Sequence, residues 1–225
     1  ISTDARKQEL YIDLITKVND ISVTYRTSGE IIFKDNTKLE LEDDFSWNGR
    51  YYVYGYGKFQ GSRTQLESAI TLAYDTYGTV VDSNSKLVWK RYRSTQASID
   101  GIVPVTSGDS IVNAVVAVSN YLGADFNAVS YMEQGHTAVE TFDNISGVHG
   151  ISLTGITYEK ALSYVGDGSP VIARIGEDEY IIITAYNSSE IAYIESSSGS
   201  VKTMSMNDAG KMFSQGGNIY VTYYK

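Results

Sequence analysis

Apolar positions recur at helical spacing in several segments of the chain. In the first segment, Thr3–Asp20, residues Leu10, Leu14 and Val18 follow one another at four-residue steps. This spacing places them on one face of a helix. The segment Asp109–Leu122 is apolar around nearly its whole circumference, so a helix there is expected to be buried on most sides. Further helices are predicted from about Arg63 to Tyr77 and over Asn127–Glu133, Thr137–Phe142, Tyr158–Val165 and Asn207–Phe213.

Short runs rich in β-branched and aromatic residues predict strands between these helices. One of them, Glu179–Asn187, is apolar almost without interruption, which is typical of a strand in the middle of a sheet. The predicted strands are Ile21–Tyr25, Glu30–Lys34, Lys38–Glu42, Tyr51–Gly57, Thr79–Asp82, Lys86–Arg91, Gly150–Leu153, Pro170–Ile175, Glu179–Asn187, Glu190–Ile194 and Asn218–Tyr224.

The order of these elements predicts two domains. Between Thr95 and Gly108 the pattern loosens around Pro104, which indicates a boundary. Residues 1–94 form an N-terminal α/β region made of a helix, hairpin strands and a β-α-β-β unit at 50–93. In residues 95–225 the helices come first and the strands follow, which is typical of an α+β fold and not of a doubly wound sheet.

Composition narrows the classes of partner. Eighteen basic and 27 acidic side chains give a net charge of −9, which argues against nucleic acid because phosphate contacts need a basic surface. No apolar run approaches the roughly 18 residues of a membrane span, so no membrane insertion is expected within this segment. The polar, tyrosine-rich and glycine-rich composition is typical of exported proteins of Gram-positive bacteria, although an ordinary soluble acidic domain can have the same composition. Because Ile1 is not a start residue, a preceding signal or anchor is expected, with an extracellular or cell-surface location.

Cysteine is absent and histidine is scarce. The 225 residues hold no cysteine and two histidines, His136 and His149. This excludes a thiol nucleophile, disulfides and thiolate metal sites within this sequence. The acidic run Glu40–Asp44 could bind a cation but is more typical of a solvated edge. The segment Asp82-Ser83-Asn84 lacks the later acidic ligands and the glycine of a calcium loop and is interpreted as a turn. No metal site and no cofactor is therefore expected.

The second half resembles a papain-like cysteine-peptidase domain, of the type found in bacterial peptidases that trim double-glycine leader peptides. The resemblance covers about residues 99–225. It is carried by four features. The first is a buried helix, and the second is a helix that is followed by a glycine-containing turn and an edge strand. The third is a mainly apolar strand, and the fourth is the end of a strand that precedes the last helix and the last strand. In this sequence these features are Asp109–Leu122, Ala161–Val165 with Gly168–Ala173, Glu179–Asn187 and Ile194–Gly199.

The resemblance implies where a catalytic site would stand. In this family a cysteine at the start of the buried helix is deprotonated by a histidine on the strand, and an Asp or Asn orients that histidine. The helix start here carries Asp109, Ser110, Asn113 and Ala114, the histidine position carries Glu179 beside Tyr180, and the orienting position carries Glu195. The resemblance therefore implies a pseudoenzyme without catalytic residues, and these seven residues are expected to line the remnant of its cleft.

A papain-like groove without catalytic groups predicts a non-catalytic binding or scaffolding module for a protein or an extended peptide. Two alternatives stay open. In one, the chain is a hydrolase that uses Ser110 or an unrelated carboxylate site, although neither histidine lies on the strand that would face Ser110. In the other, it is a structural spacer whose own side chains fill the groove.

The tyrosines of the predicted strands allow two interpretations of their role. Those that alternate along predicted strands are expected mainly to fill cross-strand pairs. An exposed tyrosine row is also typical of a peptide- or sugar-binding face. The tyrosines concerned are Tyr51, Tyr52, Tyr54, Tyr56, Tyr220, Tyr223 and Tyr224.

Overall fold

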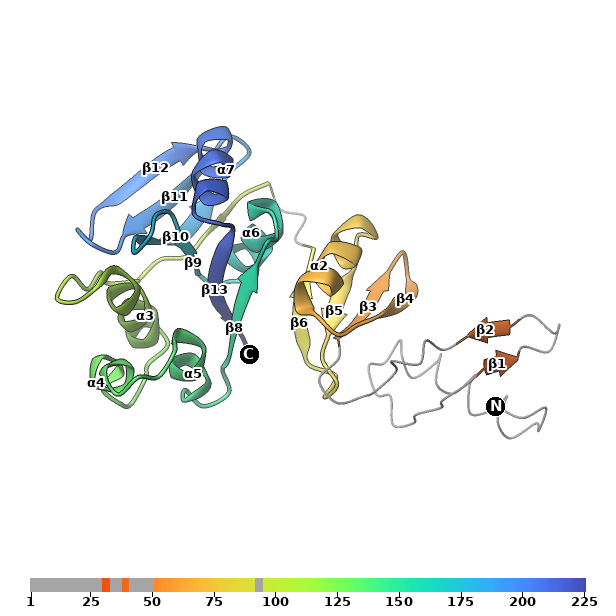
Figure 1. Cartoon of the computed structure of the whole chain (residues 1–225). Coiled ribbons are helices and arrows are strands. Elements are labelled where there is room, and N and C mark those ends of the chain that lie inside the picture. Colours follow the sequence, from red (N-terminus) through yellow and green to blue (C-terminus); the bar gives the residue numbers. More distant parts are fainter. Residues whose placement is uncertain (1–29, 33–37, 41–50, 92–94) are drawn as a thin grey trace. The chain divides into compact units, whose positions relative to one another are not determined.

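A computed structural model describes residues 30–32, 38–40, 51–91 and 95–225. The chain divides into two compact units, Ile1–Lys90 and Arg91–Lys225, which are drawn in Figure 1. The sequence-predicted boundary, between residues 94 and 95, lies beside this division. The predicted helix Thr3–Asp20 and the predicted strand Ile21–Tyr25 lie outside the described residues.

The described residues of unit 1 form two antiparallel sheets. A two-stranded ladder joins β1 to β2, and a four-stranded sheet has the order β4-β3-β5-β6. The helix α2 buries Leu66, Ala69, Ile70 and Ala73 and contacts all four strands of the larger sheet. The bounds are β1 Glu30–Ile32, β2 Lys38–Glu40, β3 Tyr51–Gly55, β4 Lys58–Arg63, α2 Leu66–Asp75, β5 Thr79–Val81 and β6 Leu87–Lys90.

The prediction of a β-α-β-β unit at 50–93 is wrong because it lacks one strand, β4. Lys58–Arg63 is a strand that pairs with β3, and Ser62 lies opposite Tyr52 in this ladder instead of capping a helix. The helix begins only at Leu66. The observed order is therefore β-β-α-β-β. The polar sequence of β4 hides the strand, which is defined by its pairing across the Tyr56-Gly57 turn.

Unit 2 combines five helices with a seven-stranded sheet, counted over its described residues. The strand order is β12-β11-β10-β9-β13-β8, with the short β7 also paired to β10, and every pairing is antiparallel. The bounds are β7 Ala97–Ser98, α3 Ser110–Tyr121, α4 Ala128–Glu133, α5 Ala138–Asp143, β8 His149–Thr154, α6 Tyr158–Gly166, β9 Val171–Arg174, β10 Tyr180–Tyr186, β11 Glu190–Glu195, β12 Val201–Ser205, α7 Met206–Gln215 and β13 Ile219–Tyr224.

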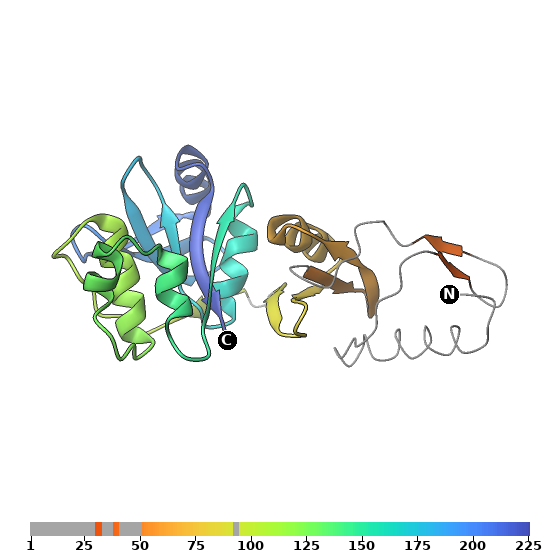
Figure 2. The same cartoon turned by 60° about the horizontal axis from the view of Figure 1, so that its bottom comes forward.

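Helices cover both faces of this sheet. On one face, Ala114 and Val118 of α3 and Phe142 of α5 share a buried core with strand residues such as Ile182 and Val221. On the other face, Phe213 of α7 contacts Tyr220, the neighbour of Val221, with ring centroids 5.8 Å apart. Figures 1 and 2 show α3, α4 and α5 on one side of the strands and α6 on the other. Unit 2 is therefore a mixed α and β fold built around an antiparallel sheet.

Burial on two faces explains the sequence of β10. Ile181, Ile182 and Ile183 are consecutive and each is at most 1% exposed, although successive side chains of a strand point to opposite faces. The strand has β11 on one side and β9 and then β7 on the other. The predicted position in the middle of a sheet agrees with this arrangement.

Candidate functional site

Three separate chain segments meet where α3 begins. The hydroxyl of Ser110 accepts a hydrogen bond from the backbone N–H of Tyr180 at 2.8 Å and lies 3.2 Å from the carbonyl oxygen of the same residue, to which it donates. The N–H of Ser196 donates to that carbonyl oxygen at 3.3 Å. The start of α3, the start of β10 and the end of β11 are thus joined at one point, named below the α3–β10–β11 junction.

A buried amide fixes the same junction from inside. The side chain of Asn113 is 1% exposed. Its Nδ2 donates to the carbonyl oxygens of Gly108 at 2.7 Å and Ser196 at 3.0 Å, and its Oδ1 accepts the N–H of Gly108 at 2.8 Å. The bond to Ser196 satisfies the carbonyl oxygen of a buried residue, and the two bonds to the exposed Gly108 fix the loop before α3. Asn113 therefore ties the loop before α3 to the end of β11.

The seven sequence-predicted site residues are distributed between the surface and the interior. Asp109 and Glu179 are exposed, and Ser110, Tyr180 and Glu195 are half-buried. Asn113 and Ala114 are buried, so they support the junction from behind and do not face solvent. The structure brings the helix start and the two strand ends together, with exposed carboxylates of Asp109 and Glu179 beside them.

Glu195 is engaged in a local network. Its Oε1 lies 2.6 Å from Nζ of Lys202, and its Oε2 accepts a hydrogen bond from the hydroxyl of Ser198 at 2.8 Å. The Lys202 ammonium and then the Ser198 hydroxyl lower the pKa of Glu195, because both stabilise the ionised carboxylate. This carboxylate therefore interacts with Lys202 of β12 and with Ser198 in the turn between β11 and β12.

Ser196 is a member of the junction whose part the sequence does not indicate. It is 3% exposed, and among the described residues its hydroxyl has no hydrogen-bond partner. Its backbone, in contrast, serves both Asn113 and Tyr180. A buried serine with a bonded backbone gives no periodic sequence signal, which is why its role was missed.

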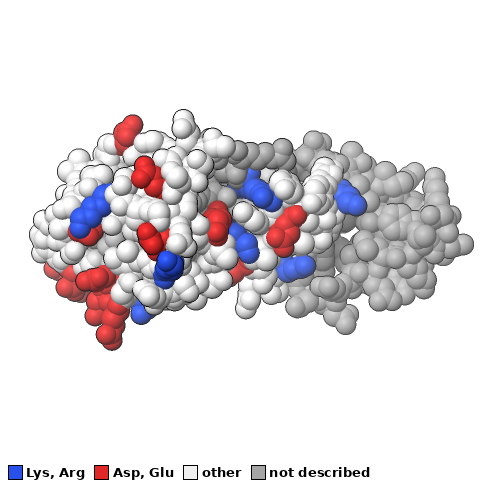
Figure 3. All heavy atoms as spheres, turned by 90° about the horizontal axis from the view of Figure 1, so that it is seen from above, with Lys and Arg blue, Asp and Glu red and all other residues white. Residues whose placement is uncertain are grey.

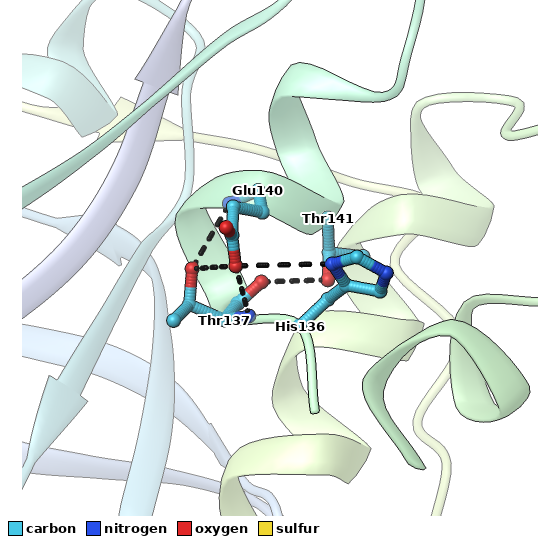
Figure 4. Close-up of polar contacts among 4 residues, drawn as sticks. All are labelled: His136, Thr137, Glu140 and Thr141. Carbon is cyan, nitrogen blue, oxygen red and sulfur yellow. Dashed lines mark hydrogen bonds and ion pairs between the residues drawn. The ribbon is translucent and has the colours of Figure 1, made fainter. Parts of the chain in front are cut away.

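The two histidines lie elsewhere in unit 2. His136 stands between α4 and α5, where its ring stacks on Tyr131 with centroids 3.8 Å apart and planes at 9°. Its Nδ1 lies 4.0 Å from Oε2 of Glu140. Figure 4 shows this corner, in which Thr137 and Glu140 form a capping box at the start of α5. The hydrogen bond from the backbone of Thr137 is the first cause that lowers the pKa of Glu140.

The predicted strand Gly150–Leu153 leaves His149 outside, and this bound is wrong. His149 is the first residue of β8, opposite Tyr224 of β13, and the two rings stack with centroids 5.0 Å apart. The pairing of β8 with β13 extends through this position, which the glycines on either side of His149 concealed. The observed contacts give both histidines structural roles.

Negative charge surrounds the exposed part of the junction. The turn between β9 and β10 carries Glu177, Asp178 and Glu179, all exposed, and Asp109 precedes α3. Figure 3 shows one group of acidic side chains at the lower left of the visible face, and other acidic and basic side chains scattered over the rest of it. Within the described part of the chain, no group of three or more His, Asp or Glu side chains is placed to hold a metal ion.

A hollow of about 500 Å³ lies at the opposite end of β10. Its floor contains Ser98, Ala185, Ala192 and Thr203, which are direct cross-strand neighbours on β7, β10, β11 and β12. Their small side chains leave the space open. This hollow was not predicted from the sequence and is separate from the α3–β10–β11 junction.

Comparisons with known proteins find one distant structural neighbour. No family model and no curated protein matches the sequence. One crystal structure, from Bacillus anthracis and described as a C39-like peptidase, aligns with a TM-score of 0.48 and 11% sequence identity, over 59% of this chain and 98% of that chain. Among the helices that the structure describes, none has the length and apolar character needed to cross a bilayer.

Proposed function

We propose that this chain is a non-catalytic member of the papain-like peptidase group, which binds a protein or an extended peptide at the α3–β10–β11 junction. The observation that carries the proposal is the meeting of the buried helix start with the two strand ends. This is where the family resemblance would put a nucleophile, a base and an orienting residue. The side chains present there are hydroxyl, amide and carboxylate groups, and the sequence contains no cysteine.

The bonding of Ser110 argues against its use as a nucleophile. Its hydroxyl oxygen already accepts the N–H of Tyr180, and its proton is directed to the carbonyl oxygen of the same residue. An activated serine needs a base within hydrogen-bond reach to remove this proton. Both histidines make their contacts at other places. The hydroxyl therefore links α3 to β10 through two hydrogen bonds.

The charge of the junction favours a basic partner. Its exposed carboxylates are those of Asp109 and of Glu177, Asp178 and Glu179 in the β9–β10 turn. Negative side chains attract lysine and arginine and repel acidic chains, and exposed attractions of this kind are screened within about 8 Å at physiological salt. The proposed partner is thus a peptide segment that carries lysine or arginine, and it is exported or surface-bound in line with the composition.

A capture experiment tests the site. The immobilised 225-residue chain is incubated with extended peptides of mixed charge, and the retained peptides are identified by mass spectrometry. We expect retention of basic peptides, with weaker retention as the salt concentration rises. The double variant Glu179→Ala/Tyr180→Ala should lose most of this retention. A matched control is Glu133→Ala/Tyr121→Ala, at the end of α4 and the far end of α3, which should retain peptides as the unmodified chain does.

The two other functional hypotheses give different results. A hydrolase that uses Ser110 would be labelled at Ser110 by a broad serine-reactive probe, and it would release cleaved peptides. A structural spacer would retain no peptide above the level of the uncoated support. Unchanged retention by the Glu179→Ala/Tyr180→Ala variant would show that binding takes place outside the junction.

A further inference from the structure

The strand β12 forms one edge of the seven-stranded sheet of unit 2, as Figure 1 shows. Its register with β11 runs from the Glu190–Ser205 pair to the Ile194–Val201 pair without a shift. Within the part of the chain that the structure describes, no strand pairs with the other side of β12. Such an edge carries backbone N–H and C=O groups that can form a ladder with another extended chain.

The backbone groups of every second residue in β12 point away from the sheet. The N–H of Glu195 donates to the carbonyl oxygen of Ser200 at 2.9 Å, so Ser200, the residue before β12, faces β11. At the other end, the N–H of Met206 donates to the residue before β11 at 2.9 Å. Because alternate residues of an antiparallel strand face the same neighbour, the backbone groups of Val201 and Thr203 face outward.

The charge on β12 does not protect this edge. Charged side chains often keep an edge strand from pairing, and Lys202 is the one charged residue of β12. Its Nζ lies 2.6 Å from Oε1 of Glu195, which follows Ile194, a residue of the core that contains α3. Successive side chains alternate between the two faces, so Lys202 and Glu195 meet on the face away from α3. The ammonium group is thus neutralised on that face.

The hollow of about 500 Å³ reaches the same edge from the other face. Its floor runs from Ser98 through Ala185 and Ala192 to Thr203 of β12. Ala192 is two residues from Ile194 on β11, so the floor lies on the face of the sheet that carries α3. A strand that pairs with β12 would place a side chain beside Thr203, with only small residues between that side chain and the hollow.

Glu190 brings a negative charge to the wall of the hollow. Its side chain is half-buried. Among the described residues, its carboxylate has one side-chain contact, a hydrogen bond of 3.4 Å from Nδ2 of Asn187 to Oε1, and it takes part in no ion pair. An ionised carboxylate can accept several hydrogen bonds, so Glu190 retains acceptor capacity for a cationic group.

We propose that β12 binds an extended peptide as an additional strand and that the hollow holds a lysine or arginine side chain of this peptide. In such complexes main-chain hydrogen bonds give affinity, and pockets for alternate side chains give specificity. The net charge of −9 also favours a basic ligand. The site shares no residue with the α3–β10–β11 junction and is independent of the function proposed above.

The register of β12 with β11 places the carboxylate within reach of such a side chain. Ser205 lies opposite Glu190, so a peptide residue paired with Ser205 would lie two strand spacings, about 10 Å, from the backbone of Glu190. A lysine or arginine side chain and a glutamate side chain together span this distance. Ser205 is small and leaves the path between them open.

The test uses the full 225-residue chain and a capped peptide of five residues, the length of β12, with threonine and valine on either side of a central lysine. Binding is followed by amide NMR signals. We expect the N–H signals of Val201 and Thr203 to shift and to exchange more slowly with solvent, because they gain hydrogen bonds. The N–H signals of Lys202 and Met204 should change less, since these groups face β11. Binding at the junction would not produce this alternation.

The variant Glu190→Gln tests the side-chain pocket. It keeps the size of the side chain but removes the charge, and it should weaken binding of the lysine peptide by about fivefold. A peptide with norleucine in place of lysine should bind the variant and the unmodified chain equally. The matched control is Glu133→Gln, at the exposed end of α4, which should bind the lysine peptide as the unmodified chain does.

A second variant, Thr203→Pro, tests strand addition. It removes an N–H that β11 does not use, a position at which an edge strand tolerates proline, and it should abolish the alternating shifts while the signals of β10 and β11 keep their positions. The proposal is overturned if the lysine peptide at about millimolar concentration leaves the β12 signals unchanged. It is also overturned if the norleucine peptide binds the unmodified chain as tightly as the lysine peptide, or if Glu190→Gln has no effect. Shifts of the β12 signals that depend on protein concentration without any peptide would assign the edge to a second copy of the chain instead.

Discussion

Ser110 connects α3 to β10 through two hydrogen bonds to one residue. Its hydroxyl serves both the N–H and the carbonyl oxygen of Tyr180. A side chain that bridges helix and strand in this way replaces a direct backbone contact. It also explains why a hydroxyl is useful at this position without any chemistry of bond cleavage.

The substitution Ser110→Ala should destabilise the chain by about 1–2 kcal/mol, because it removes both hydrogen bonds in a partly buried place. Chemical denaturation monitored by circular dichroism measures this loss. The exposed Ser107, in the loop before α3, provides the control, and Ser107→Ala should change stability by no more than about 0.5 kcal/mol. Equal losses of stability in the two variants would contradict a stabilising link between α3 and β10 through the Ser110 hydroxyl.

Asn113 has a larger expected effect. Asn113→Ala leaves the carbonyl oxygen of the buried Ser196 without this donor and removes both bonds to the backbone of the exposed Gly108, with an expected cost of about 2–3 kcal/mol. The exposed Asn120 lies on the same helix, and Asn120→Ala should be nearly neutral. Chemical denaturation of both variants measures the difference between their losses of stability. A small effect at Asn113 would show that the loop before α3 can rearrange without it.

At the scale of elements, those with strong periodicity were predicted well and polar edge strands were not. The helix α3 and the strand β10 agree with the sequence because their apolar patterns are long. The strands β4 and β12 were missed. β12 is an edge strand with mostly exposed residues, among them Val201 at 71%, so it shows no alternation. Such strands are defined by their pairing, of β4 with β3 and of β12 with β11, which a local pattern does not reveal.

The capping box of α5 makes one element sensitive to pH. The pKa of Glu140 is lowered, first by the hydrogen bond from the backbone of Thr137. A carboxyl whose pKa is lower in the folded chain stabilises it above the unfolded pKa of about 4.3, and this contribution is lost as the pH falls through the folded value. Hydrogen exchange of the α5 amides should therefore accelerate as the pH is lowered below about 4, relative to the amides of α3.

The variant Glu140→Gln isolates this effect. Glutamine keeps the size of the side chain and can still accept from the N–H of Thr137, but it does not ionise in this range. Its α5 amides should show the same relative protection above and below the transition. If the unmodified chain and the variant gave parallel profiles across this pH range, the capping carboxylate would have no part in the stability of α5.

At the scale of the whole molecule, unit 2 contains its own core. The buried cluster that joins α3 and α5 to the sheet draws all its residues from this unit. A fragment comprising Arg91–Lys225 should therefore fold alone and unfold in one cooperative transition. Differential scanning calorimetry and near-ultraviolet circular dichroism test this. A fragment with no cooperative transition would show that residues 1–90 are needed for the core.

The meeting of α3 with β10 and β11 was anticipated only through the family resemblance. Residue spacing alone does not bring Ser110 next to Tyr180, because their contact spans 70 positions of the sequence. The backbone partners of Asn113 and the interaction of Glu195 with Lys202 also depend on tertiary structure and carried no sequence signal. The absence of cysteine, in contrast, follows directly from the sequence.

Mass spectrometry of peptides exposed to the immobilised chain tests the central proposal most directly, because one experiment reads both retention and cleavage. We expect the unmodified chain and the Glu133→Ala/Tyr121→Ala control to retain basic peptides intact, and we expect the Glu179→Ala/Tyr180→Ala variant to release them. Cleaved peptides whose formation requires Ser110, or retention that is the same in all three proteins, would contradict it.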